Sequence, residues 1–267
     1  MRTAIWLCEN ITFLEFATAL SPGRVKVVSW MKRAKAKQRE NTAIARKFRA
    51  FIERSTFPCL GAKAALNRGT YRLQSYTEFG NSMVSTYLAS DLQRFINSPL
   101  RLRSDFATFG AIFSRPLEMT ELEFEHRLWR ILQQLNRIDA EKFDWDPTVG
   151  RAPECANFAF SFGGHAFYIV GMHPRSSRLA RRFPLPALMF NLHEQFRKLR
   201  TEGKWERMKA SIRKRDVALQ GEWNPMLDDF GQSSEARQYS GRAVDESWTP
   251  SFQAAQMGQA ARCPFPH

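Results

Sequence analysis

Residues 158–170 read FAFSFGGHAFYIV, and the fold of the chain is decided in this stretch. Phe occupies every second position of its first half, which is the period of a β-strand. Gly163 and Gly164 can both take positive φ angles, so they predict a tight hairpin turn. The chain then returns as a buried strand over residues 166–170. This pattern predicts an α+β fold in which helices pack on a central mixed or antiparallel sheet.

Further elements are predicted on both sides of the hairpin. Residues 187–190 (ALMF) predict a third strand, and a helical pattern starts at His193 and breaks near Gly203. Upstream, Thr120 and Glu123 form a capping box, which predicts that a long helix begins there. The earlier part of the chain predicts, in order, helix 41–54, strand 71–75, helix 85–95 and strand 106–113.

The composition predicts one large folded domain. The chain has 267 residues, of which 22 are Phe and 7 are Trp, and these supply a substantial apolar core. We expect this domain over residues 41–245, after an N-terminal extension with a basic helix (1–40) and before an irregular tail (246–267). The four cysteines form no CxxC pair, which argues against structural zinc or a disulfide framework and favours the reducing cytoplasm. No stretch has the length and hydrophobicity of a membrane span.

The net charge of +14 attracts anions of every kind. The basic residues are dispersed, however, and the densest run, residues 31–39, is more typical of a solvated helix face than of a nucleic-acid contact. The motifs CxxCH, GxSxG, HExxH and a Walker loop are absent from the sequence. Covalent haem, an α/β-hydrolase, a zincin and a P-loop enzyme are therefore disfavoured.

A first group of candidate functional residues lies in the loop over residues 171–183, which leaves a predicted central strand. This loop carries His173 among four arginines. A neutral imidazole there could bind a metal, while the arginines could pair with carboxylates. The alternative is an ordinary loop histidine that bonds to a backbone carbonyl, with the arginines on the surface.

A second group follows the third predicted strand. His193 starts the next helix, so the two histidines could share one cleft, although a core or capping histidine fits this position equally well. Carboxylates near Asp216 and in residues 220–231 could receive a cationic substrate. The mixed polarity of residues 234–242 suggests a hydrogen-bond network that includes Glu235. Solvated surface groups are the alternative for both acidic regions.

Several ordered motifs resemble those of the YqcI/YcgG family over about residues 45–245. They are FPCLGA (57–62), FSFGG (160–164), GMHP (171–174), FNLH (190–193), NPML (224–227) and SEARQYSGR (234–242). The resemblance implies haem b (iron protoporphyrin IX) as cofactor and hydroxylation of a guanidine nitrogen in natural-product (antibiotic) biosynthesis. The reaction implied most closely is the conversion of L-arginine to Nω-hydroxy-L-arginine.

This resemblance also implies roles for individual residues. The axial iron ligand is expected to be His173 or His193, with the thiolate of Cys59 as the alternative. Three arginines are expected to neutralise the haem propionates, namely Arg178, Arg181 and Arg182. Three acidic residues are candidates for the carboxylate that binds the guanidinium group, namely Glu194, Asp216 and Glu235.

The partners implied are a small guanidino substrate, O2 or peroxide, and an external reductant, with a homo-oligomer left open. Two other functions also stay open at this point. One is a non-catalytic haem carrier or sensor, and the other is a basic nucleic-acid-binding protein without a metal. Turnover of arginine separates the first from an enzyme, and a haem absorbance band excludes the second.

Overall fold

The computed structural model describes residues 41–100, 106–222, 224, 226 and 231–255. Residues from Ile44 onward form one compact unit, to which the following description applies. The expected N-terminal extension with its basic run 31–39, the cysteines Cys8 and Cys263, and residues 256–267 lie outside the described residues.

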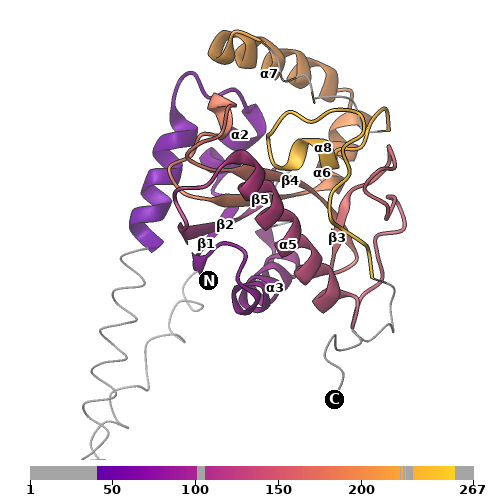
Figure 1. Ribbon diagram of the computed structural model, residues 1–267. Coiled ribbons are helices and arrows are strands. Elements are labelled where there is room, and N and C mark those ends of the chain that lie inside the picture. The colour runs from indigo at the N-terminus through magenta and orange to yellow at the C-terminus, as the bar shows by residue number, and fades with distance from the viewer. Residues whose placement is uncertain (1–40, 101–105, 223, 225, 227–230, 256–267) are drawn as a thin grey trace, which may run out of the picture. The chain divides into compact units, whose positions relative to one another are not determined.

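The described elements are a mixture of helices and strands (Figure 1). After a helix over residues 44–53 they are α2 (Leu60–Arg68), β1 (Tyr71–Glu78), α3 (Ser82–Ile96), β2 (Thr108–Arg115), α5 (Glu121–Asp139), β3 (Phe160–Phe162), β4 (His165–Met172), η2 (Leu179–Arg181), β5 (Ala187–Leu192), α6 (His193–Thr201), α7 (Trp205–Gln220) and α8 (Ala236–Tyr239). The predicted helices and strands are confirmed, with ends shifted by a few residues.

The strands form a five-stranded sheet in the order β1-β2-β5-β4-β3. β1 pairs with β2 in parallel, and the other three pairs are antiparallel, so the sheet is mixed. The expected α+β class with a mixed sheet packed by helices is therefore confirmed. Gly163 and Gly164 close the β3–β4 hairpin with φ angles of 61° and 73°, as their sequence predicts.

One face of the sheet packs against α3 and α5 (Figure 1). Thr120 and Glu123 form the predicted capping box at the start of α5, and the helix buries Phe124 and Leu128 on its inner side. On the sheet, every second residue points to this face, including Phe109, Phe167 and Phe190. This layer forms the larger hydrophobic core. The resulting rigid sheet then presents its opposite face to the remaining helices.

The opposite face is covered by helix 44–53, α2 and the loop that contains η2. Phe48 and Ile52 of the first helix pack with Met172 and Met189 of the sheet and with Phe183 of the loop. This second apolar cluster covers only part of the face. The helices α6 and α7 lie over the rest of it. The space that remains between them is the candidate site described below.

The described part of the C-terminal segment, residues 246–255, contains no helix or strand. It is nevertheless attached to the core. Phe252 is 5% exposed and contacts the rings of Trp129, Trp145 and Phe158. Hydrogen bonds from this segment to α5 hold it there, such as Gln253 N to Gln133 Oε1 at 2.8 Å.

A glycine determines how closely β4 approaches its covering helices. A Cβ atom at Gly171 would lie 2.6 Å from Phe124 Cε1 and 2.7 Å from the backbone oxygen of Tyr239. We expect Gly171→Ala to lower the free energy of unfolding by about 1–3 kcal/mol, because the added methyl overpacks a contact that includes rigid backbone. Urea denaturation measures this loss. Thr77→Ala, on an exposed position of β1, is the control and should change stability by less than about 0.5 kcal/mol.

Candidate ligand-binding cavity

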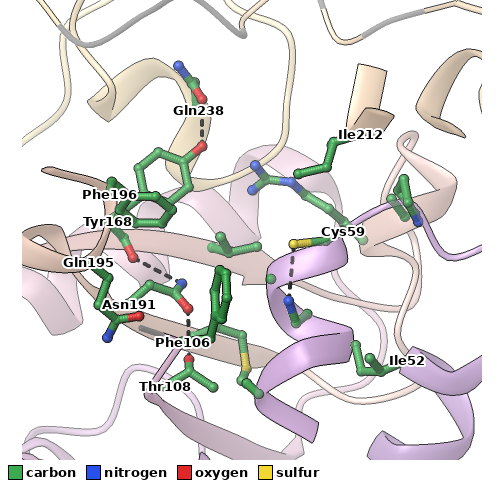
Figure 2. A pocket seen from close by; sticks show the side chains of 18 of the residues that line it. Ile52, Cys59, Phe106, Thr108, Tyr168, Asn191, Gln195, Phe196, Ile212 and Gln238 are labelled. Carbon is green, nitrogen blue, oxygen red and sulfur yellow. Dashed lines mark hydrogen bonds between the residues drawn. The ribbon is translucent and has the colours of Figure 1, made fainter. Parts of the chain in front are cut away.

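A cavity of about 290 Å³ lies on the second face of the sheet. Such a volume is close to the lower end of about 300–1,000 Å³ that is typical of small-molecule sites. Its floor is formed by β1, β2, β5 and β4, and its walls by helix 44–53, α2, α6, α7 and the η2 loop. The lining is mainly apolar, and a limited set of polar and charged side chains interrupts it (Figure 2).

The floor carries a row of polar side chains across three adjacent strands. Asn191 pairs in register with Tyr168 on one side and with Thr108 on the other. Thr108 Oγ1 donates to Asn191 Oδ1 at 2.8 Å, and Asn191 Nδ2 donates to the backbone oxygen of Tyr168 at 3.3 Å. The Tyr168 hydroxyl donates to Gln238 Oε1 at 2.5 Å, which extends the row to the wall of the cavity (Figure 2).

A row of apolar residues lies next to this polar row, two positions away on each strand. Val170 and Met189 line the cavity there, and Gly110 lies between Met189 and Leu73. A Cβ atom at Gly110 would lie 2.5 Å from Leu73 Cδ2 and 2.8 Å from Met189 Cε. The glycine therefore leaves room for these side chains to form a smooth apolar floor. A flat ligand with polar groups at one edge matches this division of the floor.

Cys59 lies at the N-terminus of α2 and lines the cavity across from Tyr168 (Figure 2). It is the N-cap residue, and its Sγ accepts a hydrogen bond from the Ala62 amide at 3.4 Å. Burial raises the pKa of the Cys59 thiol, against the effect of the Ala62 and Gly61 amides and of Arg181, which lower it. The free thiol is thus neutral, while the backbone amides at the helix N-terminus favour the thiolate form.

Two buried arginines line the cavity from the η2 loop, Arg178 and Arg181. Arg178 Nη2 donates to Asp216 Oδ2 at 2.6 Å, whereas its buried Nη1 has no hydrogen-bond partner among the described residues and lies 3.6 Å from Glu222 Oε1. The Arg181 guanidinium donates to the backbone oxygens of Gly171 and Tyr239 at 3.4 and 3.1 Å. Burial lowers the pKa of Arg181 because it disfavours the charged guanidinium form, so an anion in the cavity would stabilise that charged form.

His193 and Glu235 form a buried pair on the α6 side of the cavity. His193 Nε2 lies 2.9 Å from Glu235 Oε2, and both residues line the cavity. The Tyr239 hydroxyl donates to Glu235 Oε1 at 2.6 Å and accepts from the Phe160 amide at 3.0 Å. The Tyr239 hydroxyl thus accepts a hydrogen bond from the Phe160 amide and donates its own hydrogen to Glu235. The Glu235 carboxylate is therefore the acceptor in this bond. Burial raises the pKa of Tyr239, and the Glu235 charge raises it further.

His173 lies away from His193, on the α5 side of the sheet. Its ring stacks on Phe124 with centroids 4.4 Å apart, it is 1% exposed, and it is not among the residues that line the cavity. Neither ring nitrogen has a hydrogen-bond partner among the described residues. Burial lowers the pKa of His173 to about 4, with a smaller lowering by Arg181 and a raising by Glu121. The structure thus separates the two histidines that the sequence placed at neighbouring strand ends.

Of the three remaining candidates from the sequence, one lines the cavity and two do not. Asp216 lines the cavity but is paired with Arg178, and Glu194 is half-buried outside the cavity lining. Arg182 is exposed and donates to the backbone oxygen of Ser176 at 2.8 Å, which holds the loop rather than the cavity.

Sequence reasoning missed several cavity residues, among them Tyr168, Asn191 and Gln238. The two-residue period of β4 and β5 could have placed Tyr168 with Val170 and Asn191 with Met189 on common faces. No local signal could have shown that Cys59 and Gln238 would border the same face.

No group of three or more His, Cys, Asp or Glu side chains among the described residues is placed to hold a metal ion. An axial haem ligand needs only one such side chain, so this result bears on multi-ligand sites alone. In the part of the chain that was described, no helix combines the length and the apolar character needed to cross a membrane.

These features define an α+β domain that encloses a mainly apolar, ligand-sized cavity between one face of a mixed sheet and its covering helices. The YqcI/YcgG family model matches residues 48–253. The chain therefore belongs to the YqcI/YcgG family. No curated protein and no solved structure matches the chain significantly.

Proposed function

We propose that this protein binds haem in the cavity and hydroxylates a guanidino nitrogen, with L-arginine as the substrate and Nω-hydroxy-L-arginine as the product. One observation carries the proposal. A buried thiol at a helix N-terminus, Cys59, lines the same apolar cavity as Arg178, whose buried Nη1 has no hydrogen-bond partner within the described part of the chain. A soft metal donor and a buried guanidinium group with one nitrogen open to a further hydrogen bond, both beside an apolar space, suit the iron, the acid arms and the ring of an iron porphyrin.

The donor set favours Cys59 as the axial ligand. His193 lines the cavity, but its Nε2 is engaged by Glu235 at 2.9 Å, and His173 does not line the cavity. Among the described residues, the Cys59 sulfur accepts hydrogen bonds from backbone amides of its own helix, and such bonds to a metal-bound thiolate would moderate its electron donation. Arg178 and Arg181 would hold the propionates, because both are buried cations that line the cavity.

The bound haem would supply the activation of O2 or peroxide and the transfer of one oxygen atom to nitrogen. The chain's own residues bind and orient the substrate. Glu235 is a buried acceptor that lines the cavity, and its carboxylate has acceptor sites beyond the two bonds to Tyr239 and His193. It is therefore the favoured partner of the guanidinium group. Asp216 is less suitable because Arg178 already neutralises it.

The apolar walls have the separate role of excluding water. Phe196, Trp205 and Ile212 line the cavity from α6 and α7. Exclusion of water strengthens the attraction between Glu235 and a guanidinium cation and prevents loss of the activated oxidant to solvent. We place this reaction in the cytoplasm and in a natural-product pathway, with an external reductant when O2 is the oxidant.

The test is a titration of the purified full-length protein with haemin, followed by incubation with L-arginine, a reductant and O2, or with peroxide. We expect a Soret band and formation of Nω-hydroxy-L-arginine, detected by mass spectrometry. A Soret band without turnover would replace the proposal by a haem carrier or sensor. A protein that stays colourless and binds DNA or RNA instead would replace it by a nucleic-acid-binding function.

Glu235→Gln is expected to reduce kcat/KM for L-arginine by roughly 10- to 150-fold, because hydrogen bonds to charged groups contribute about 1.5–3 kcal/mol. Glutamine preserves the shape and can still accept from Tyr239, so the haem absorbance should be retained. Glu194→Gln, outside the cavity lining, is the matched control and should leave kcat/KM unchanged. Equal rates for both variants would exclude Glu235 as the guanidinium partner.

A further inference from the structure

Helix α7 covers the cavity without being packed into a core. Trp205, Met208 and Ile212 lie on one side of the helix and line the cavity, yet none of them is buried. Asp216 is the only residue of α7 that is buried. The main contacts of α7 are with α6 and η2 (Figure 1). Its apolar side therefore faces the space that a ligand would occupy.

Glycines mark both ends of this helix. Gly203 precedes it with φ 67° and Gly221 follows it with φ 89°. A Cβ atom added at either position would meet nothing within 4 Å. Both backbones are thus in the region that glycine adopts without strain, and neither is confined by neighbouring atoms. These are the properties of positions that can absorb a rotation of the helix between them.

Polar contacts near the C-terminal half hold α7 in place. Arg178 Nη2 donates to Asp216 Oδ2 at 2.6 Å. Arg215 Nη2 donates to the backbone oxygens of Ser55 and Phe57 at 2.6 and 3.0 Å, and Gln220 Oε1 accepts from the Leu179 amide at 2.8 Å. A helix held by a few polar contacts over an apolar space opens at a much lower free energy than a core helix.

Arg178 links these contacts to the cavity, because the two halves of its guanidinium group have different surroundings. Its Nη2 is bonded to Asp216, whereas its buried Nη1 has no hydrogen-bond partner in the part of the chain that the structure describes and lies 3.6 Å from Glu222 Oε1. A carboxylate of a ligand in the cavity could bond to Nη1 while Asp216 keeps Nη2. A ligand that did so would fix the Arg178 side chain and, through Asp216, the helix.

We propose that α7 is a hinged lid over the cavity and that Arg178 holds the lid closed when a carboxylate-bearing apolar ligand bonds to its Nη1 atom. The lid rotates about Gly203 and Gly221. Closure requires the ligand's charge as well as its apolar surface. Arg178 therefore both selects anionic ligands and retains them. This proposal concerns the chemical class of the ligand and does not require that the ligand contains iron.

Hydrogen exchange of the full chain, followed by mass spectrometry, tests the lid. In the ligand-free protein, we expect amides of α7 to exchange at least about tenfold faster than those of α5, because α5 is anchored in the core. Dodecanoate, an apolar carboxylate, should slow exchange in α7, and the neutral dodecanol should not. Exchange of α7 as slow as that of α5, no response to dodecanoate, or an equal response to both probes would each overturn the proposal.

A pair of variants tests the role of Arg178 in closing the lid. Asp216→Asn removes the charge that ties α7 to Arg178 and should speed exchange of α7 in the dodecanoate-bound protein by roughly tenfold, equivalent to about 1.4 kcal/mol. Glu206→Gln removes an acid of the same helix that pairs with Lys209 at 2.8 Å, and should have no effect. Equal exchange in the two variants would overturn the role of Arg178. Because neither probe contains iron, these results are independent of haem binding.

Discussion

Replacing Cys59 by serine is expected to lower the affinity for haemin by at least about 100-fold, since even the loss of an outer-shell partner of a metal site costs roughly 10- to 100-fold. The substitution removes the sulfur donor but keeps the cap of α2. A serine hydroxyl accepts from the same helix amide that Cys59 Sγ binds, and serine is among the most favoured N-cap residues. The fold should therefore survive while the iron ligand is lost.

The measurement is a haemin titration followed through the Soret band, together with the ferrous carbon monoxide spectrum, which distinguishes thiolate from imidazole ligation. Cys155→Ser is the matched control, because Cys155 is exposed and should leave both signals unchanged. His193→Ala separates the alternatives. If this variant loses haem and Cys59→Ser keeps it, the axial ligand is the imidazole and the assignment of Cys59 is wrong.

Because His173 is held neutral in the folded protein, its contribution to stability is expected to fall by about 2–3 kcal/mol between about pH 7 and pH 4.5. Burial lowers the pKa of His173 from 6.5 to about 4 in the folded protein. The unfolded chain therefore binds a proton near pH 6.5 while the folded protein does not. The contribution of His173 to the free energy of unfolding is therefore fully present above pH 6.5 and is lost as the pH falls toward 4.

Another buried group acts in the opposite direction, so a single pH titration does not isolate His173. Burial raises the pKa of Asp139 to about 7, although the Gly163 amide that donates to its carboxylate lowers it. Protonation of Asp139 thus favours the folded protein as the pH falls. The comparison of wild type with His173→Phe cancels this contribution, because Asp139 is present in both proteins.

Phenylalanine retains the aromatic stack on Phe124 and removes two ring nitrogens that have no hydrogen-bond partner among the described residues. Urea denaturation at both pH values gives the two free energies of unfolding. The difference between variant and wild type should grow by about 2–3 kcal/mol from pH 7 to pH 4.5. A difference that does not change with pH would show that His173 is not held neutral in the folded protein.

The sequence alone determined the secondary structure and the fold class. The capping box of Thr120 and Glu123, the glycine pair of the β3–β4 hairpin and the alternation of Phe in residues 158–162 all depend on neighbours within about four residues. Such short-range preferences act in the same way whatever the rest of the chain does. The ordered motifs also indicated the family, which the match over residues 48–253 established.

Only the tertiary structure decided which candidate residues share a site. His173 and His193 both follow strands, yet one stacks on Phe124 beside α5 and the other lines the cavity beside α6. The strand order, the register and the choice of covering helices put them on opposite sides of the sheet. The same long-range pairing brought Cys59 from the start of α2 to the face that carries Tyr168. Because these contacts join segments far apart in the chain, no local periodicity encodes them.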